Sequence, residues 1–300
     1  MKERVALAVG GGVVAVGIGL WALVAPGASG QPAASSSSRP AQTVTPSPTD
    51  ARSDVITADG ETGLHLVFNA EFTGDKLDTS TWATCYPWLD VPSGCTNFNN
   101  GEVEWYLPAQ DQVRGGALHL VAEPKATEGT SKSGAPEEYA CRSGMVSSFP
   151  SFRFKYGLVK IVARIPDGEG LWSGLWLAAA NEKWPPEIDM LERWGPPSNI
   201  AGVYMHPTGV KNKHEALDRV HLSQSLAATL DSGWHTFSIL WTAQKVTWYV
   251  DGQQVMTATS HIPHQLMYII ANLADFKTGA GACNGQLLVR SVKVWQQPAH

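Results

Sequence analysis

Three acidic side chains within six residues are the part of this sequence best suited to chemistry. They are Glu187, Asp189 and Glu192, in the segment WPPEIDMLERWG. Carboxylates held a few ångströms apart resist joint ionisation, so at least one of them has a raised pKa. One protonated and one ionised carboxyl can together protonate a leaving oxygen and stabilise or attack the carbon that it leaves, as cleavage of a glycosidic bond requires. We therefore take these three acids as candidate catalytic residues; the alternative is a solvated acidic strand.

The spacing of the acids indicates how a strand would have to present them. Side chains two apart share one face of a strand, so Glu187 and Asp189 lie together while Ile188 points into the core. Glu192 lies five positions after Glu187, which in a regular strand places it on the opposite face. We predict a β-bulge at 190–191, because one extra residue brings Glu192 back beside the other two acids and bulges are common next to active sites.

Tryptophans flank the acidic segment. Trp172 and Trp176 are four apart, so in a strand both lie on one face, and Trp184 and Trp194 bracket the acids. The C–H face of a pyranose ring packs against indole while its hydroxyl groups bind acids at the rim. We expect these four tryptophans to contact a sugar, with core packing as the alternative for each. Core packing is expected instead for the tryptophans within apolar runs: Trp241, Trp248 and Trp295.

The composition indicates a folded β domain. Of the 300 residues, 43% are apolar and 16% are charged, which is enough to bury a large core and too little charge for a disordered chain. The net charge of −5 and the lack of a Lys/Arg cluster argue against nucleic acid as a partner. The 12 Trp and 29 Gly are typical of a turn-rich β protein with aromatic surface for a ligand.

The first 53 residues precede the folded domain. Basic residues come before an apolar run from Val5 to Val24, so residues 1–30 are predicted to be a signal peptide or, if uncleaved, a membrane anchor. Residues 31–53 are rich in Pro, Ser and Thr and are predicted to be a disordered linker. Residues 54–300 are predicted to form one catalytic β-sandwich domain. The protein is then secreted or extracytoplasmic, either free or anchored by its N-terminal segment.

Alternation and turn residues predict an all-β domain with antiparallel strands. In GLVKIVARIP, Val159 and Ile161 alternate with Lys160, which is typical of a strand with one buried face. Two strand-like runs flank Asp251 and Gly252, whose residue types tolerate the positive φ angles of a tight hairpin turn. No repeat with a period of 20 to 50 residues is present, which disfavours a propeller or solenoid.

The four cysteines suit an oxidising compartment and allow three pairings. Cys85 with Cys95 is the preferred first bridge, because it would pin the short loop between them. Cys141 and Cys283 then pair or stay free, and four buried thiols are the alternative. None of the four has metal-ligand spacing, and we predict neither a metal nor a cofactor.

Six segments of the domain carry a family resemblance: FNAEFTGDKLDTSTW, NNGEVEWYLPAQ, CRSGMVSS, GEGLWSGLWLAAANEKWPPEIDMLERWG, WHTFSILWTAQKVTWYVDG and YIIANLAD. They resemble glycoside hydrolase family 16, the laminarinase and lichenase group. The resemblance implies a β-jelly-roll sandwich of two antiparallel sheets with a concave cleft, and a retaining, endo-acting hydrolase of a β-linked polysaccharide. It makes Glu187 the nucleophile, Glu192 the general acid/base and Asp189 the residue that tunes them, with carboxyls roughly 5 to 5.5 Å apart.

The resemblance also implies further substrate contacts. Trp172 and Trp176 match cleft tryptophans of the family, Glu102 matches the acid of an Asn-x-Glu segment, and Asn272 matches an Asn on a late strand. His206 is expected in the cleft, and His235 is expected to be structural.

Some positions depart from the family pattern. Lys160 and Val162 stand where many relatives have Glu and Arg, and Met145 replaces a frequent Arg, so we expect the outer subsites to differ. Lys160 could favour a decorated or acidic polymer. Arg290 stands where the family often has an acid, which argues against the structural calcium of some members.

Two other functions stay open. A carbohydrate-binding module needs the same sandwich and tryptophans but has no use for three clustered acids. A transglycosylase shares the nucleophile and differs in whether sugar or water accepts the glycosyl group. The substrate is expected to be β-1,3-glucan or mixed-linkage glucan, with a microbial exopolysaccharide as the alternative, and the protein is expected to be a monomer.

Overall fold

The computed structural model describes residues 63–89, 94–196, 200–208, 218–230, 233–276 and 283–298. The predicted signal or anchor segment (1–30) and linker (31–53) lie outside these residues, so the predicted domain boundary stays a prediction. Among the described residues, no helix combines the length and the apolar composition that crossing a membrane requires.

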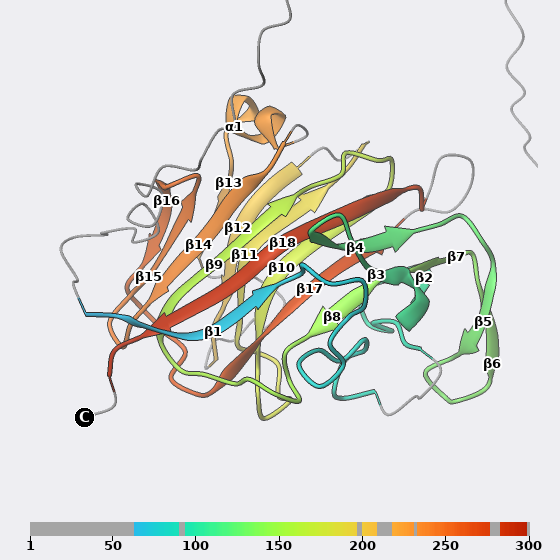
Figure 1. Cartoon of the computed structure of the whole chain (residues 1–300), viewed down its shortest axis with the longest axis horizontal. Coiled ribbons are helices and arrows are strands. Elements are labelled where there is room, and N and C mark those ends of the chain that lie inside the picture. Colours follow the sequence, from blue (N-terminus) through green and yellow to red (C-terminus); the bar gives the residue numbers. More distant parts are fainter. Residues whose placement is uncertain are drawn as a thin grey trace, which may run out of the picture. The chain divides into compact units, whose positions relative to one another are not determined.

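Two large antiparallel sheets make up most of the described domain (Figure 1). The larger has the order β16 (Gln253–Ala258), β15 (Val246–Val250), β14 (His235–Trp241), β9 (Gly157–Arg164), β18 (Gly285–Gln296), β4 (Ala117–Ala122) and β3 (Asp111–Arg114), with β1 (His65–Glu71) also paired to β18. The smaller has the order β13 (Asp218–His221), β12 (Ile200–His206), β11 (Glu187–Trp194), β10 (Leu171–Ala179), β17 (Met267–Asp275) and β8 (Met145–Ser147).

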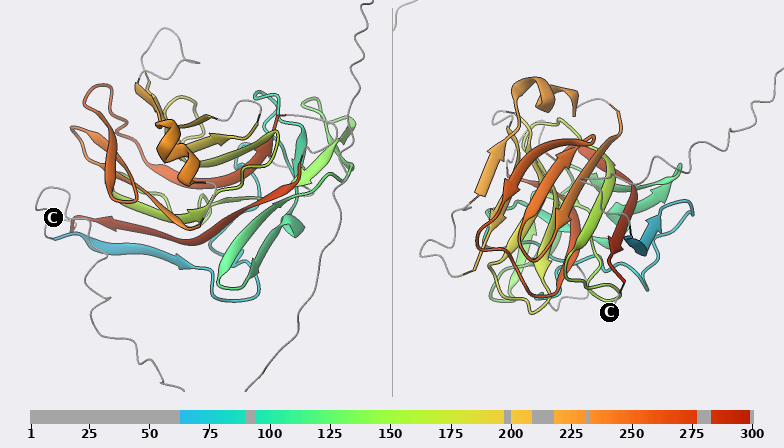
Figure 2. Two further views of the ribbon diagram at one scale, coloured as in Figure 1. Left: turned by 90° about the horizontal axis from the view of Figure 1, so that it is seen from above. Right: turned by 90° about the vertical axis from the view of Figure 1, so that its left-hand side faces the viewer.

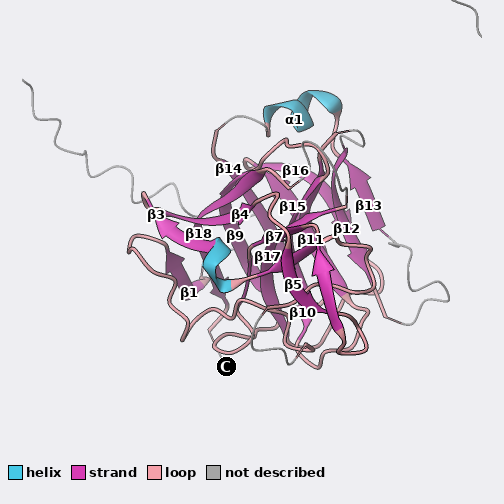
Figure 3. Cartoon of the chain, turned by 90° about the vertical axis from the view of Figure 1, so that its right-hand side faces the viewer, coloured by secondary structure: helices cyan, strands magenta, loops and turns pink. Residues whose placement is uncertain are grey.

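The remaining elements are short. Strand β2 (Glu104–Tyr106) pairs in parallel with β7 (Cys141–Ser143), and β5 (Thr127–Thr130) pairs with β6 (Pro136–Tyr139). Helix α1 (Gln224–Thr229) and the 3₁₀ helix Pro108–Gln110 are the helical elements in Figure 3, where strands and loops make up the other described parts of the domain.

The two sheets pack face to face and share one hydrophobic core (Figure 2). On β9, Val159 and Ile161 are fully buried, whereas Lys160 between them lies on the outer face. From the smaller sheet, Leu175 and Leu177 are equally buried in the same core. Each such side chain contributes about 1.5–3 kcal/mol when it leaves water, so the period-two alternation largely specifies the sandwich. The predicted all-β sandwich of antiparallel sheets is confirmed.

The predicted hairpin is present between β15 and β16. Asp251 and Gly252 have φ angles of 49° and 78°, as a two-residue turn with the twist of its strands needs.

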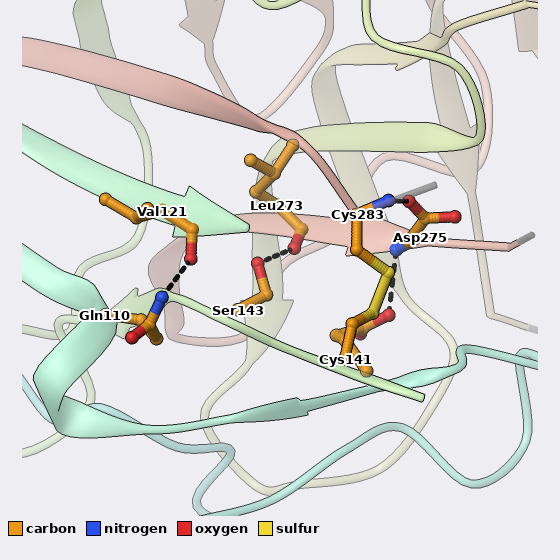
Figure 4. The surroundings of a disulfide bond; sticks show 8 residues. Gln110, Val121, Cys141, Ser143, Leu273, Asp275 and Cys283 are labelled. Atoms are coloured by element: carbon orange, nitrogen blue, oxygen red, sulfur yellow. Dashed lines mark hydrogen bonds between the residues drawn. A yellow bond between two sulfur atoms is a disulfide. The ribbon is translucent and has the colours of Figure 1, made fainter. Parts of the chain in front are cut away.

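Two disulfide bonds hold the end of the domain that carries β2 and β7. Cys85 is bonded to Cys95, as preferred from the sequence, and Cys141 is bonded to Cys283. Cys95 also exchanges backbone hydrogen bonds with Tyr106 of β2, at 3.1 and 2.7 Å. The second bond, shown in Figure 4, joins β7 to the segment that leads into β18. The Cys85–Cys95 bond and the hydrogen bonds of Cys95 therefore attach both ends of the loop after Cys85 to β2.

Candidate active site

Strand β11 contains the predicted bulge. Leu191 pairs with Leu175 of β10 and Asp189 pairs with Trp176, so Met190 is an extra residue in the register. The pairing of β11 with β12 shifts at the same place. Met190 and Leu191 are consecutive and both buried in the core, which returns the following residue to the opposite face.

Trp248 of the larger sheet holds the bulge from the other side of the core. Its indole Nε1–H donates to the backbone carbonyl oxygen of Asp189 over 2.8 Å, and the ring is fully buried. A bulge leaves backbone groups without a partner in the ladder, and a buried carbonyl without a donor is costly. Trp248 is thus a core residue, as expected, and it also reaches the strand that carries the acids.

A groove of about 1090 Å³ runs over the outer face of the smaller sheet, and both Glu187 and Glu192 line it. Asp189 lies beneath them and is 2% exposed. The other predicted contact residues also line the groove: Glu102, Trp172, Trp176, Trp184, Trp194, His206 and Asn272. The structure therefore brings together all ten residues that the sequence selected, nine on the groove surface and Asp189 below it.

Each of the two groove acids accepts one hydrogen bond from a tryptophan. Trp184 Nε1 donates to Glu187 Oε2 over 3.1 Å, and Trp172 Nε1 donates to Glu192 Oε1 over 3.0 Å. His206 Nε2 lies 3.7 Å from Glu187 Oε1 and 3.8 Å from Asp189 Oδ2. These contacts fix the carboxyl orientations while both carboxyl groups still face the groove.

Burial sets the protonation of the three acids. It raises the pKa of Glu187 to about 7, and burial together with the Glu187 charge raises the pKa of Glu192 to about 8. The pKa of Asp189 rises well above its usual range because of its burial and then the charges of Glu187 and Glu192. All three acids therefore hold their protons more tightly than exposed carboxyls, and their mutual repulsion disfavours joint ionisation.

The tryptophans form a floor that polar contacts hold in place. Trp172 stacks on Trp194 with ring centroids 5.2 Å apart, and Trp176 Nε1 donates to Asn272 Oδ1 over 2.8 Å. A Cβ at Gly174 would lie 2.5 Å from that Asn272 oxygen, so only glycine leaves room for this contact. Trp172 and Trp176 therefore both face the groove, and the indole N–H group of each is bound to protein.

Several groove residues were not selected from the sequence. They are Tyr86, Trp88, Asn97, Asn99, Asn100, Glu182, Lys183, Tyr204 and Arg219. Tyr204 could have been found, because it lies two residues before His206 on one strand and so shares its face. The residues before β2 carry no such signal, because they belong to loops whose position depends on the Cys85–Cys95 bond.

The expectation for Lys160 is wrong. It lies on the outer face of the larger sheet with Nζ 5.6 Å from the Trp295 ring centroid, away from the groove. Met145 is fully buried, with its sulfur 3.9 Å from Cys95 Sγ, and does not line the groove either. His235 pairs through Nδ1 with Asp251 Oδ2 over 2.7 Å at the β15–β16 turn.

The fold and the site together define a β-jelly-roll sandwich whose open groove is centred on buried carboxyls. The model of the glycosyl hydrolases family 16 matches residues 110–284, which is more than half of the chain. The chain belongs to this family, and the resemblance of its motifs is confirmed.

Curated relatives match over part of their length. The chain is 32% identical to endo-1,3-1,4-beta-glycanase ExsH of Rhizobium meliloti over 226 residues, covering 70% of this chain and 46% of that protein. It is 28% identical to glucan endo-1,3-beta-glucosidase A1 of Niallia circulans over 237 residues, covering 71% of this chain and 34% of that protein. The chain thus spans half or less of the length of these relatives.

Solved structures share the fold. The laminarinase catalytic domain of Thermotoga maritima superposes with a TM-score of 0.64 at 22% identity, covering 79% of this chain and 100% of that one. The endo-beta-1,3-glucanase of Pyrococcus furiosus superposes with a TM-score of 0.64 at 22% identity, covering 81% and 97%.

Proposed function

We propose that this protein is a retaining, endo-acting glycoside hydrolase that cleaves β-1,3-glucan or mixed-linkage glucan by double displacement. The observation that carries the proposal is the bulge in β11, which turns Glu187 and Glu192 into one groove with Asp189 between them. Family membership and the similarity to relatives named as a 1,3-1,4-beta-glycanase and a 1,3-beta-glucosidase support this substrate class.

The raised pKa values of the acids support a division of roles. The ionised carboxylate of Glu187 attacks the anomeric carbon, and Glu192 donates its proton to the leaving oxygen and later takes one from water. Asp189 holds its proton beneath the two glutamates, where a neutral carboxyl adds no further negative charge. The four tryptophans, Glu102, His206 and Asn272 bind the sugar rings on either side of the broken bond.

The stereochemistry of the first product tests the mechanism. Proton NMR of a fresh digest of mixed-linkage glucan should show the β-anomer before mutarotation, with oligosaccharides of intermediate size. An α-anomer as the first product would contradict double displacement. The same digest run with a labelled acceptor oligosaccharide separates hydrolysis from transglycosylation, because only transfer carries the label into longer products. A protein that binds glucan without any turnover would be a binding module.

We also propose that the protein acts outside the cytoplasm, secreted or anchored by residues 1–30. Its two disulfide bonds form and persist in oxidising compartments. Cell fractionation followed by N-terminal sequencing of the recovered protein tests both the location and the cleavage. The expected monomer is checked by light scattering.

A further inference from the structure

Exposed aromatic rings gather at the groove. Among the described residues, the exposed large apolar side chains are Leu66, Val67, Trp88, Trp184 and Leu266. The two aromatic ones, Trp88 and Trp184, both line the groove. Trp184 contacts Glu187 and so belongs to the catalytic centre. Trp88 contacts none of the three acids, and the proposed reaction gives it no role.

Trp88 is held flat by the residue beneath it. Its ring stacks on Tyr86 with centroids 4.6 Å apart and an interplanar angle of 16°. Tyr86 is 1% exposed and lies in turn against Tyr106 of β2, with centroids 5.9 Å apart. Trp88 itself is 36% exposed, so its outer face is available to a ligand. A rigid ring with one buried and one open face costs little conformational entropy when a sugar packs on it.

The Trp88 segment is fixed at the far end of the groove. Ala83 bonds to Ser147 of β8 over 2.9 Å, and the disulfide Cys85–Cys95 ties the segment to β2. Strand β8 is the edge of the smaller sheet, three strands from β11 in the order β11, β10, β17, β8. The Tyr86 ring beneath Trp88 also lies 6.3 Å from the Trp176 ring of β10, so Trp88 extends the aromatic floor beyond Trp176 on the side of β8.

The polar groups at this end fit an uncharged sugar. Asn97, Asn99, Asn100 and Glu102 line the groove there. Glu102 accepts hydrogen bonds from Asn97 N at 3.2 Å and from Asn100 Nδ2 at 3.4 Å. Amides and a carboxylate bind hydroxyl groups, and the carboxylate repels an anionic substituent.

We propose that Trp88, supported by Tyr86 and the Cys85–Cys95 bond, is the platform of a distal subsite that binds one uncharged pyranose ring of the polysaccharide cleaved at β11. The inference rests on the proposed function and adds a site to it. The subsite is reached only by chains that extend from the acids of β11 past Trp176 to Trp88. It makes the protein prefer long substrates over short ones.

The test compares Trp88→Ala with wild type on β-1,3-gluco-oligosaccharides of increasing length and on soluble β-1,3-glucan. The ratio of kcat/KM on the polymer to kcat/KM on the shortest cleaved oligosaccharide should fall about tenfold, the size of one good aromatic contact. Trp88→Phe should recover most of the ratio because it keeps a flat ring on Tyr86. Trp234→Ala is the matched control, since Trp234 is a partly exposed tryptophan under Arg290 and lies outside the groove. An unchanged ratio in Trp88→Ala overturns the subsite.

A binding measurement separates this inference from the proposed function. In the Glu187→Gln background, affinity electrophoresis in gels with soluble β-1,3-glucan should show retardation that Trp88→Ala clearly weakens. Retardation that Trp88→Ala leaves intact overturns the subsite, whatever the activity of the wild type. Retardation weakened in Trp88→Ala, with no hydrolysis by the wild type, supports the subsite and overturns the hydrolase. Carboxymethylated β-1,3-glucan in the gel should retard the protein less than the unmodified glucan does. Stronger retardation by the carboxymethylated polymer would overturn the preference for an uncharged ring.

Discussion

Two groups of acidic side chains lie beside the groove, and they differ in what their oxygen atoms already bind. On β11, Glu187 and Glu192 each accept one indole N–H and turn their carboxyl groups to the groove. Beside β2, Glu104 is fully buried, and its Oε2 accepts the backbone N–H of Asp275 over 2.8 Å. The β11 acids therefore have oxygen atoms that can still bind a substrate, whereas Glu104 uses an oxygen atom in a hydrogen bond that stabilises the fold.

Glu104 belongs to a chain of contacts that holds the second disulfide in place. The Asp275 that donates to it also accepts, through its own carboxylate, the backbone N–H of Cys283 (Figure 4). Burial and then the charge of Glu102 raise the pKa of Glu104 well above its usual range. The second oxygen of Glu104, Oε1, accepts no hydrogen bond from the described residues. If Glu104 is protonated, this oxygen can donate a hydrogen bond to Glu102. A carboxyl pair with raised pKa values therefore indicates catalysis only when it also faces a groove that can hold a ligand.

A short polar chain joins the two groups. Trp176, which pairs with Asp189, donates to Asn272 Oδ1, and Asn272 Nδ2 donates to Tyr106 Oη over 3.0 Å. Tyr106 in turn contacts both Glu102 and Glu104. A glutamate-to-glutamine substitution in each group tests whether the two groups have different roles.

The largest difference is expected for glutamine substitutions. Glu187→Gln removes the proposed nucleophile and should lower turnover of β-glucan by about a thousandfold or more. Glu104→Gln should keep activity within a few-fold, because an amide still accepts from Asp275 N and can donate to Glu102 as the protonated acid does. Initial rates of reducing-sugar release check both. Comparable activity in the two variants would contradict the division between the groups.

The second difference concerns the support of the β11 acids. Trp248→Phe keeps the aromatic ring and removes the donor to Asp189 O, so the bulge can shift and kcat should fall about ten- to a hundredfold with little change in KM. Trp241→Phe is the matched control, since Trp241 is also fully buried and donates to a backbone carbonyl, that of Pro263, over 3.1 Å. Equal losses of kcat in the two variants would show that Trp248 acts through general stability alone.

The third difference is in folding stability. Glu104→Leu leaves the buried Asp275 N–H without an acceptor and should lower the free energy of unfolding by about 2 kcal/mol. Glu104→Gln, which keeps the acceptor, should lower it much less. Urea denaturation with intact disulfides measures both. A Glu104→Gln variant as unstable as Glu104→Leu would argue against the proton shared with Glu102.

The smallest effect is on the pH dependence of stability. The folded state keeps the Glu192 proton up to a pKa of about 8, whereas the unfolded chain loses it near pH 4.3. Between these values the unfolded state binds fewer protons, so stability falls as pH rises. Glu192→Gln removes this loss and should raise Tm at pH 8.5 by about 3 °C or more, with little change at pH 4. Glu138→Gln, an exposed position on β6, is the control. An equal Tm for Glu192→Gln and wild type at pH 8.5 would contradict the raised pKa.

The spacing of residues along the chain is enough to predict the local geometry of β11. The separations of Glu187, Asp189 and Glu192, set against a period of two, require a bulge for all three to meet, and the alternation in β9 and the Asp251–Gly252 turn required antiparallel strands. These predictions succeed because the direction of a side chain within one strand follows from spacing alone.

Tertiary structure decided everything that depends on contacts between distant segments. It placed Trp248 under the bulge, moved Lys160 to the outer face of the other sheet, and brought Trp88 to the groove through the Cys85–Cys95 bond. It also made Glu104 structural and Glu187 available to a ligand, although both are glutamates in short acidic patterns. The pKa and the free oxygen atoms of a carboxyl depend on burial and on partners far away along the chain, and spacing carries no information about either.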